Sequence, residues 1–128
     1  MSAKISALRY SVEPGDIPGA IRVLLDDYEQ SGDMMIRVLA LEHRFPDLTE
    51  VLTLARAGHR EWVAYVFEPY LPPRGPRRDD AISRLVVCTD VYAWQLLRRD
   101  LGQSRTATRN HLLATVEAVV ASLKEKTA

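Results

Sequence analysis

Histidine and cysteine are the residue types of this chain best suited to metal binding or nucleophilic catalysis, and they occur as His43, His59, His111 and Cys88. Zinc sites need such side chains in close sets, for example two histidines one helical turn apart. The three histidines are far apart and have no cysteine or paired carboxylates beside them. No serine elbow or phosphate-binding glycine loop occurs, and the glycines of 15–19 follow no strand pattern. We therefore expect no metal, no cofactor and no enzymatic activity, and we interpret the histidines as surface residues.

Cys88 and Asp90 lie in a strongly apolar stretch, where each could serve either chemistry or structure. Valines flank Cys88, which favours a small buried thiol over a redox switch. A carboxylate such as Asp90 is unfavourable in an apolar helix unless a partner pairs with it. We expect Arg84, Arg98 or a neighbouring hydroxyl to be that partner, and direct contact with a ligand is the alternative.

Helix-period patterns separated by proline and glycine clusters divide the first half of the chain, and no strand pattern occurs. Residues 1–15 are expected to form an N-terminal extension that is partly disordered. A first helix is predicted over 16–30, and the Ser-Gly pair at 31–32 is predicted to end it. A second helix follows over 33–45, because the residue before Pro46 is disfavoured in the helical conformation.

The second half of the chain begins with a capping-box pattern at 47–50, which predicts the start of a long helix. Prolines exclude a continuous helix over 69–78, which is expected to be a Pro-rich loop. Further helices are predicted over 79–100 and 104–124. The whole is predicted to be an all-α fold of about five helices, in a single domain that spans residues 1–128.

Composition limits the partners that the chain can have. The chain has 128 residues, and 47% of them are hydrophobic, which is enough for one globular domain. Seventeen basic residues balance seventeen acidic ones, so no net charge attracts nucleic acid or an anionic membrane. No apolar run is long enough to span a bilayer, and no export signal is recognisable. With a single cysteine that cannot close an intrachain disulfide, these features indicate a cytoplasmic protein.

The segment 79–100 is apolar on nearly all sides, unlike a helix that covers a core with one face. A single neighbouring helix cannot bury such a surface. The helix predicted over 104–124 likewise carries two apolar stripes. We therefore expect a second copy of the chain to cover these helices, as in a homodimer.

Two segments resemble the carboxy-terminal half of TetR-family transcriptional regulators. They read GDMMIRVLALEHRFPDLTEVLTLARAGHREWVAYVF over 32–67 and DVYAWQLLRRDL over 90–101. The resemblance extends over about 14–123 and includes the turn at 13–16. It implies a helical module that dimerises through its last two long helices and holds a small-molecule pocket among the others.

The resemblance also implies particular site residues. For the dimer interface these are Val87, Val91, Trp94, Arg98, Val116, Val119, Val120 and Leu123. For the ligand pocket they are Met35, Leu39, Trp62, Val66, Cys88 and Tyr92, because methionine and aromatic side chains make adaptable apolar walls and the Tyr92 hydroxyl can hydrogen-bond a ligand. Plain core packing is the alternative for each pocket residue.

Members of that family begin with a helix-turn-helix unit, which residues 1–10 are too few to contain. We therefore expect a regulatory domain that binds a small apolar effector, forms a homodimer and does not itself contact DNA. The alternative is a standalone helical dimer that sequesters a full-length regulator by mixed dimerisation.

Overall fold

The computed structural model describes residues 3–127, which form helices and contain no β-strand. The long helices are α2 (Ile17–Leu41), α3 (Pro46–Val66), α4 (Pro76–Thr89) and α6 (Arg105–Thr127), and the short ones are α1 (Ala3–Arg9) and α5 (Val91–Gln95). A 3₁₀ turn, Glu68–Tyr70, follows α3, and a π-helical turn, Leu96–Asp100, continues α5. The predicted all-α fold of about five helices is confirmed. Between residues 3 and 127, no helix combines the length and apolar character that crossing a bilayer requires.

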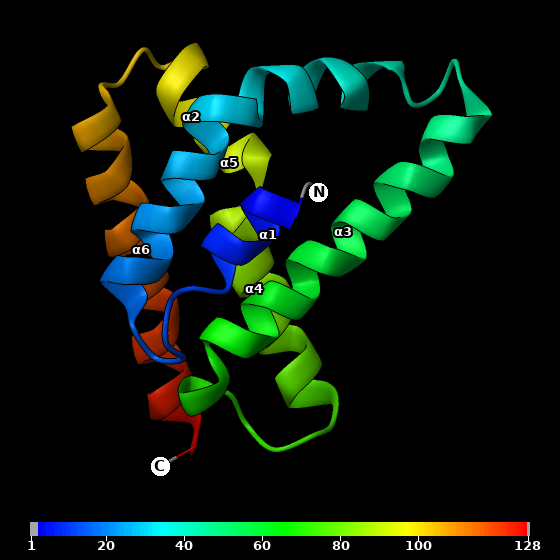
Figure 1. Cartoon of the computed structure of the whole chain (residues 1–128). Coiled ribbons are helices and arrows are strands. Elements are labelled where there is room, and N and C mark those ends of the chain that lie inside the picture. The colour runs from blue at the N-terminus through cyan, green and yellow to red at the C-terminus, as the bar shows by residue number, and fades with distance from the viewer. Residues whose placement is uncertain (1–2, 128) are drawn as a thin grey trace.

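The helices are arranged around one core. In Figure 1, α2 and α3 form two arms of a V that meet at the corner of residues 42–45, and α6 lies beside α2. α5 packs against α2, and α4 packs against both α3 and α6. Leu24, Trp62, Leu85 and Val116, one from each long helix, are completely buried. Four long helices therefore share a single apolar interior.

Ser31 and Gly32 do not end a helix, so the prediction of separate helices over 16–30 and 33–45 is wrong. α2 runs through both residues. The Ser31 hydroxyl donates to the carbonyl oxygen of Asp27, one turn earlier, at 2.9 Å. Gly32 is buried against the indole of Trp94, and a Cβ at this position would lie 2.5 Å from Cζ3 of that ring. The glycine therefore permits close approach of α5 rather than a turn.

α3 begins two residues earlier than the capping pattern predicts, because a cap at Asp47 would make Leu48 the first helical residue. Pro46 is its first residue, where the fixed φ of proline suits the first turn. Asp47 is already helical, so the predicted capping box at 47–50 is wrong. In the first turn its carboxylate still interacts favourably with the helix dipole.

The segment 79–100 is not one helix, which is a further correction. α4 ends at Thr89, and Asp90 adopts an extended conformation with ψ of 156° before α5 begins. Asp90 Oδ2 accepts a hydrogen bond from the backbone N–H of Tyr92 at 3.0 Å and thus caps α5. The observed hydrogen-bond partner of Asp90 is therefore a backbone amide, and not Arg84, Arg98 or a hydroxyl. The break also rotates the residues after Asp90 away from the face that Val87 occupies.

The N-terminal segment is part of the packed structure over its described residues. α1 occupies residues 3–9, and Val12 is buried in the core. The backbone N–H of Gly15 donates to the carbonyl of Val66 at 2.7 Å, and the Tyr70 hydroxyl donates to the carbonyl of Gly15 at 2.6 Å. The extension expected over 1–15 is thus ordered from residue 3 onward, and its first two residues lie outside the described part.

The Pro-rich loop is shorter than predicted. The 3₁₀ turn reaches Tyr70 and α4 starts at Pro76, so only 71–75 of the expected 69–78 lies outside helices. An ion pair between Arg78 and Glu68 closes the loop. The loop places α4 across the end of α3, which brings the start of α5 close to the V.

Candidate functional site

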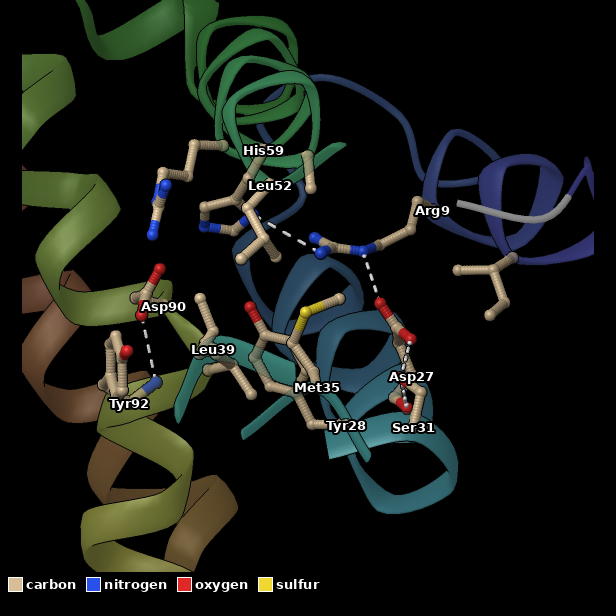
Figure 2. A pocket seen from close by; sticks show the side chains of 14 residues that line it. Arg9, Asp27, Tyr28, Ser31, Met35, Leu39, Leu52, His59, Asp90 and Tyr92 are labelled. Carbon is tan, nitrogen blue, oxygen red and sulfur yellow. Dashed lines mark hydrogen bonds and ion pairs between the residues drawn. The ribbon is translucent and has the colours of Figure 1, made fainter. Parts of the chain in front are cut away.

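A cavity of about 190 Å³ lies where α1, α2, α3 and the junction of α4 with α5 meet. Figure 2 shows side chains from these elements around one space. The lining residues are Ile5, Arg9, Asp27, Tyr28, Ser31, Met35, Leu39, Leu52, Ala55, Arg56, His59, Asp90, Val91 and Tyr92. The set combines an apolar wall with several polar groups, as small-molecule sites do.

The apolar wall comes from helical spacing on the two arms of the V. Met35 and Leu39 are one turn apart on α2, and Leu52 and Ala55 are one turn apart on α3. Val91, at the start of α5, completes this wall and is buried. These residues offer contacts that suit an aliphatic or aromatic group.

A buried ion pair forms part of the polar end. Arg9 Nε donates to Asp27 Oδ2 at 3.0 Å, and both side chains are more than nine-tenths buried. Asp27 Oδ1 also accepts a hydrogen bond from the Ser31 hydroxyl at 2.8 Å. The guanidinium of Arg9 lies over the Trp62 ring, with Cζ 4.5 Å from the ring centroid. Pairing and cation–π contact therefore compensate the burial of the Arg9 charge.

His59 links this ion pair to α4. Arg9 Nη2 lies 3.4 Å from His59 Nδ1, and His59 Nε2 lies 2.9 Å from the Thr89 hydroxyl oxygen. Burial, together with the positive charge of Arg9, lowers the pKa of His59 to about 3. The imidazole is therefore neutral, with Nδ1 accepting from Arg9 and Nε2 donating to Thr89. The Thr89 hydroxyl in turn donates to the carbonyl of Leu85 at 2.7 Å. This leaves its oxygen free to accept the hydrogen bond from His59, so one donor faces one acceptor at each step from Arg9 to Leu85.

Tyr28 occupies the centre of the site in Figure 2. Its hydroxyl donates to the backbone carbonyl of Thr89 at 2.7 Å, and the residue is buried. Burial raises the pKa of this phenol above its ordinary value, so it stays protonated at neutral pH. Tyr28 thus joins α2 to the end of α4 as a neutral group.

Charged and polar side chains also line the site near the end of α4. Arg56 makes two hydrogen bonds to the carboxylate of Glu42, at 2.7 and 2.9 Å, which join α3 to the end of α2. These bonds lower the pKa of Glu42. Asp90 and the half-exposed Tyr92 lie close together in Figure 2. Two positive and two negative side chains therefore line the cavity: Arg9, Arg56, Asp27 and Asp90.

The six predicted pocket residues divide into two groups. Met35, Leu39 and Tyr92 line the cavity, whereas Trp62, Val66 and Cys88 do not. Trp62 and Val66 are fully buried core residues, and Cys88 is half-buried. Burial raises the pKa of the Cys88 thiol, which reduces its reactivity at neutral pH.

Sequence reasoning missed the polar end of the cavity. The sequence pattern puts Arg9 in the extension, does not distinguish Asp27 and predicts a surface position for His59, which is in fact buried. One signal was available for His59, because it falls on the same face of α3 as Leu52 and Trp62. Asp27 similarly interrupts the apolar positions around Leu24 and Tyr28.

Most residues predicted at the dimer interface pack inside the chain, so the predicted seam is wrong. Val91, Trp94, Val116, Val120 and Leu123 are buried without a second copy, and Val119 is partly buried. Val87 is 71% exposed, but the break at Asp90 separates it from the others.

Arg98 and Trp94 both bind Glu29 of α2. Arg98 pairs with Glu29 at 3.0 Å, and the indole N–H of Trp94 donates to the same carboxylate at 2.7 Å. Partial burial acts to raise the pKa of Glu29, but these hydrogen bonds outweigh it and lower the pKa. These two predicted interface residues therefore connect α5 and the π-helical turn to α2 through interactions within one chain.

Among the described residues, no group of three or more histidine, cysteine or acidic side chains could hold a metal ion. The site consists of an apolar wall and a polar end in which Arg9 and Asp27 are paired. No family model, curated protein or solved structure matches this chain.

Proposed function

We propose that this chain is a sensor domain that binds a small, largely apolar molecule in the cavity between α2 and α3. The observation that carries the proposal is the cavity, because its wall is apolar and its buried polar groups are held in place by hydrogen bonds. Its volume of about 190 Å³ suits a molecule with one ring, since an apolar cavity of about 150 Å³ in another protein binds benzene.

The polar side chains of the cavity are arranged for binding a ligand rather than for catalysis. A general base needs a free lone pair that faces the substrate. Both nitrogens of His59 are engaged, and Asp27 is held by Arg9 and Ser31. The half-buried Cys88 thiol lies outside the cavity lining. These arrangements favour a site that orients a ligand.

The sensor that we propose is the regulatory domain of a TetR-like transcriptional regulator. The two segments that carry the resemblance, 32–67 and 90–101, supply most of the cavity wall, including Met35, Leu52 and Val91. A molecule bound there would favour one packing of α2 against α3 over another. In an intact regulator of this kind, such a change would alter the spacing of two DNA-reading units.

The proposal includes a homodimer that uses the outer surfaces of α4 and α6. Val87 is exposed on α4, and Ala114, Ala118 and Ala121 are exposed at helical spacing along α6. Small side chains let a second helix approach closely, and the buried residues of the core need not move. This surface replaces the seam that the sequence predicted.

The cavity proposal is tested with a pair of alanine variants on α3. Ala55 lines the cavity and Ala57 is exposed, so Ala55→Trp fills the site and Ala57→Trp is the matched control. We expect single-ring aromatic compounds to raise the melting temperature of the wild type and of Ala57→Trp, but not that of Ala55→Trp. Equal shifts for all three proteins, or no shift for the wild type, would contradict the proposed function.

A further inference from the structure

We infer that the cavity selects electrically neutral molecules that carry a hydrogen-bond acceptor oxygen, such as a ketone or an ester, over carboxylates and amines of the same size. The inference rests on the proposed function, because it specifies the class of ligand for the same site. Three features carry it: the balance of charge around the cavity, the unpartnered donor on Arg9 and the volume.

Charge balance disfavours an ionised ligand at the buried end. Arg9 and Asp27 pair at 3.0 Å, and His59 and Tyr28 are neutral, so no net charge is left there to compensate an ion. A carboxylate bound beside Arg9 would be close to the carboxylate of Asp27. An ammonium group bound beside Asp27 would be close to the guanidinium of Arg9. Either ion would lose its hydration without gaining a counter-ion.

The other charged groups of the lining do not reverse this balance. Arg56 is held by both carboxylate oxygens of Glu42, and its charge also interacts with that of Asp90. Two carboxylates therefore accompany one guanidinium at this part of the site. An anionic ligand meets repulsion here as well. An ammonium group gains little from the excess negative charge, because Arg56 and Tyr92 are half-exposed and water screens the charges at this end of the lining.

The hydrogen-bonding capacity of the lining indicates an acceptor on the ligand. The Tyr28 hydroxyl donates to Thr89, and the Ser31 hydroxyl donates to Asp27. Arg9 Nη1, in contrast, is buried and has no hydrogen-bond partner among the described residues. Arg9 lines the cavity, and its Nη1 has almost no accessible surface, so a small movement of the guanidinium would let a ligand oxygen supply the missing acceptor.

The volume restricts the ligand to about one ring with a short substituent. This allows a test series of nearly equal size: acetophenone is neutral with an acceptor, ethylbenzene is neutral without one, benzoate is an anion and benzylamine is a cation. Dissociation constants for the wild type at pH 7.5 are measured by protein NMR titration. We expect acetophenone to bind about tenfold more tightly than ethylbenzene, from one added hydrogen bond, and at least tenfold more tightly than either ion.

A charge-changing variant supplies the second arm of the experiment. Asp27→Asn keeps the shape of the side chain but leaves the charge of Arg9 without a counter-ion, so we expect benzoate to become the preferred ligand. Asp26→Asn is the matched control, because Asp26 is the adjacent carboxylate, lies outside the cavity lining and pairs with Arg105. This variant is expected to keep the ranking of the wild type. If Asp27→Asn does not fold, the order of the four affinities measured for the wild type decides whether the inference stands.

The outcomes separate this inference from the proposed function. Equal affinity for acetophenone and ethylbenzene, or a preference of the wild type for benzoate or benzylamine, overturns the inference. If Ala55→Trp still abolishes binding in that case, the proposed function stands. Failure of all four compounds to bind overturns both. An unchanged preference in a folded Asp27→Asn variant also overturns the inference, since charge balance would then not determine selectivity.

Discussion

His59 is kept neutral by burial and by the neighbouring charge of Arg9, and this makes the stability of the fold sensitive to acid. In the unfolded chain a histidine has a pKa of about 6.5, whereas in the folded chain the pKa of His59 is about 3. Between these values the unfolded state binds a proton that the folded state does not. The free energy of unfolding therefore falls as the pH falls through this window, by at most about 1.4 kcal/mol per pH unit, and is unaffected by this group above it.

We predict that His59→Gln removes this contribution between pH 6.5 and 5, although it lowers stability at pH 7.5 because hydrogen bonds are lost. Urea unfolding measured at several pH values gives the slope for each protein. His111→Gln is the control. Because His111 is exposed, we expect this variant to show the same dependence of the free energy of unfolding on pH as the wild type. The same slope in His59→Gln and the wild type would show that another group causes the acid sensitivity.

The residues of the site could be predicted from the sequence only where they belong to a local pattern. Met35 and Leu39 share a helix face, so the apolar wall on α2 was foreseeable. The ion pair between Arg9 and Asp27 was not, because it joins residues 18 positions apart through a tertiary contact. No local spacing rule encodes such a contact, and a charged residue by itself most often indicates a solvated surface.

Two glycines inside helices show how tertiary packing changes the meaning of a local signal. Gly32 of α2 lies against Trp94, whereas a Cβ on Gly58 of α3 would have no other described atom within 4 Å outside its own helix turn. The sequence rule that glycine ends or weakens a helix treats both alike. Only the crossing of α5 over α2 distinguishes them, and this crossing depends on the whole fold.

We predict opposite effects for Gly32→Ala and Gly58→Ala. The first introduces a methyl group into the Trp94 ring and should lower the free energy of unfolding by about 1–3 kcal/mol. The second improves helix propensity in open space and should raise it by up to about 1 kcal/mol. Chemical denaturation of the two variants tests both signs. Stabilisation by Gly32→Ala would mean that α5 does not cross α2 as described.

At the level of whole helices, the sequence located the apolar segments but not all of their limits. Periodicity gave the positions of α3 and α6 to within a few residues, because each has a proline or a serine cap at its start. The break at Asp90 was missed, since the apolar residues on both sides of it continue the same pattern. An aspartate that caps a helix and an aspartate buried within one look identical without the backbone conformation.

The assembly of the molecule is a consequence of which apolar residues the single chain already covers. The two-sided apolar character of 79–100 predicts a second copy, but the break at Asp90 lets one chain bury Val91 and Trp94 against α2. The surface that we propose for a partner is the outer face of α4 and α6, where Val87 is exposed. An interface formed there would bury less apolar surface than the interface that the sequence predicts.

We predict that light scattering after size exclusion gives twice the chain mass of 14.4 kDa for the wild type. Ala118→Arg, which places a long charged side chain in the middle of the alanine stripe of α6, should give the monomer mass with unchanged helical content. Ala57→Arg on the exposed face of α3 is the control and should remain dimeric. A monomeric wild type at all concentrations would refute the homodimer.

The two tryptophans of the chain occupy different environments, and this gives the molecule two built-in optical reporters. Trp62 contacts Arg9 and stacks on His59, with a centroid distance of 5.7 Å, so its emission senses the electric field beside the cavity. Trp94 is hydrogen-bonded to Glu29 and packed on Gly32, on the side of α2 that faces α5. In a Trp94→Phe background, we therefore expect intrinsic fluorescence to report whether the proposed ligand occupies the cavity, without an added dye.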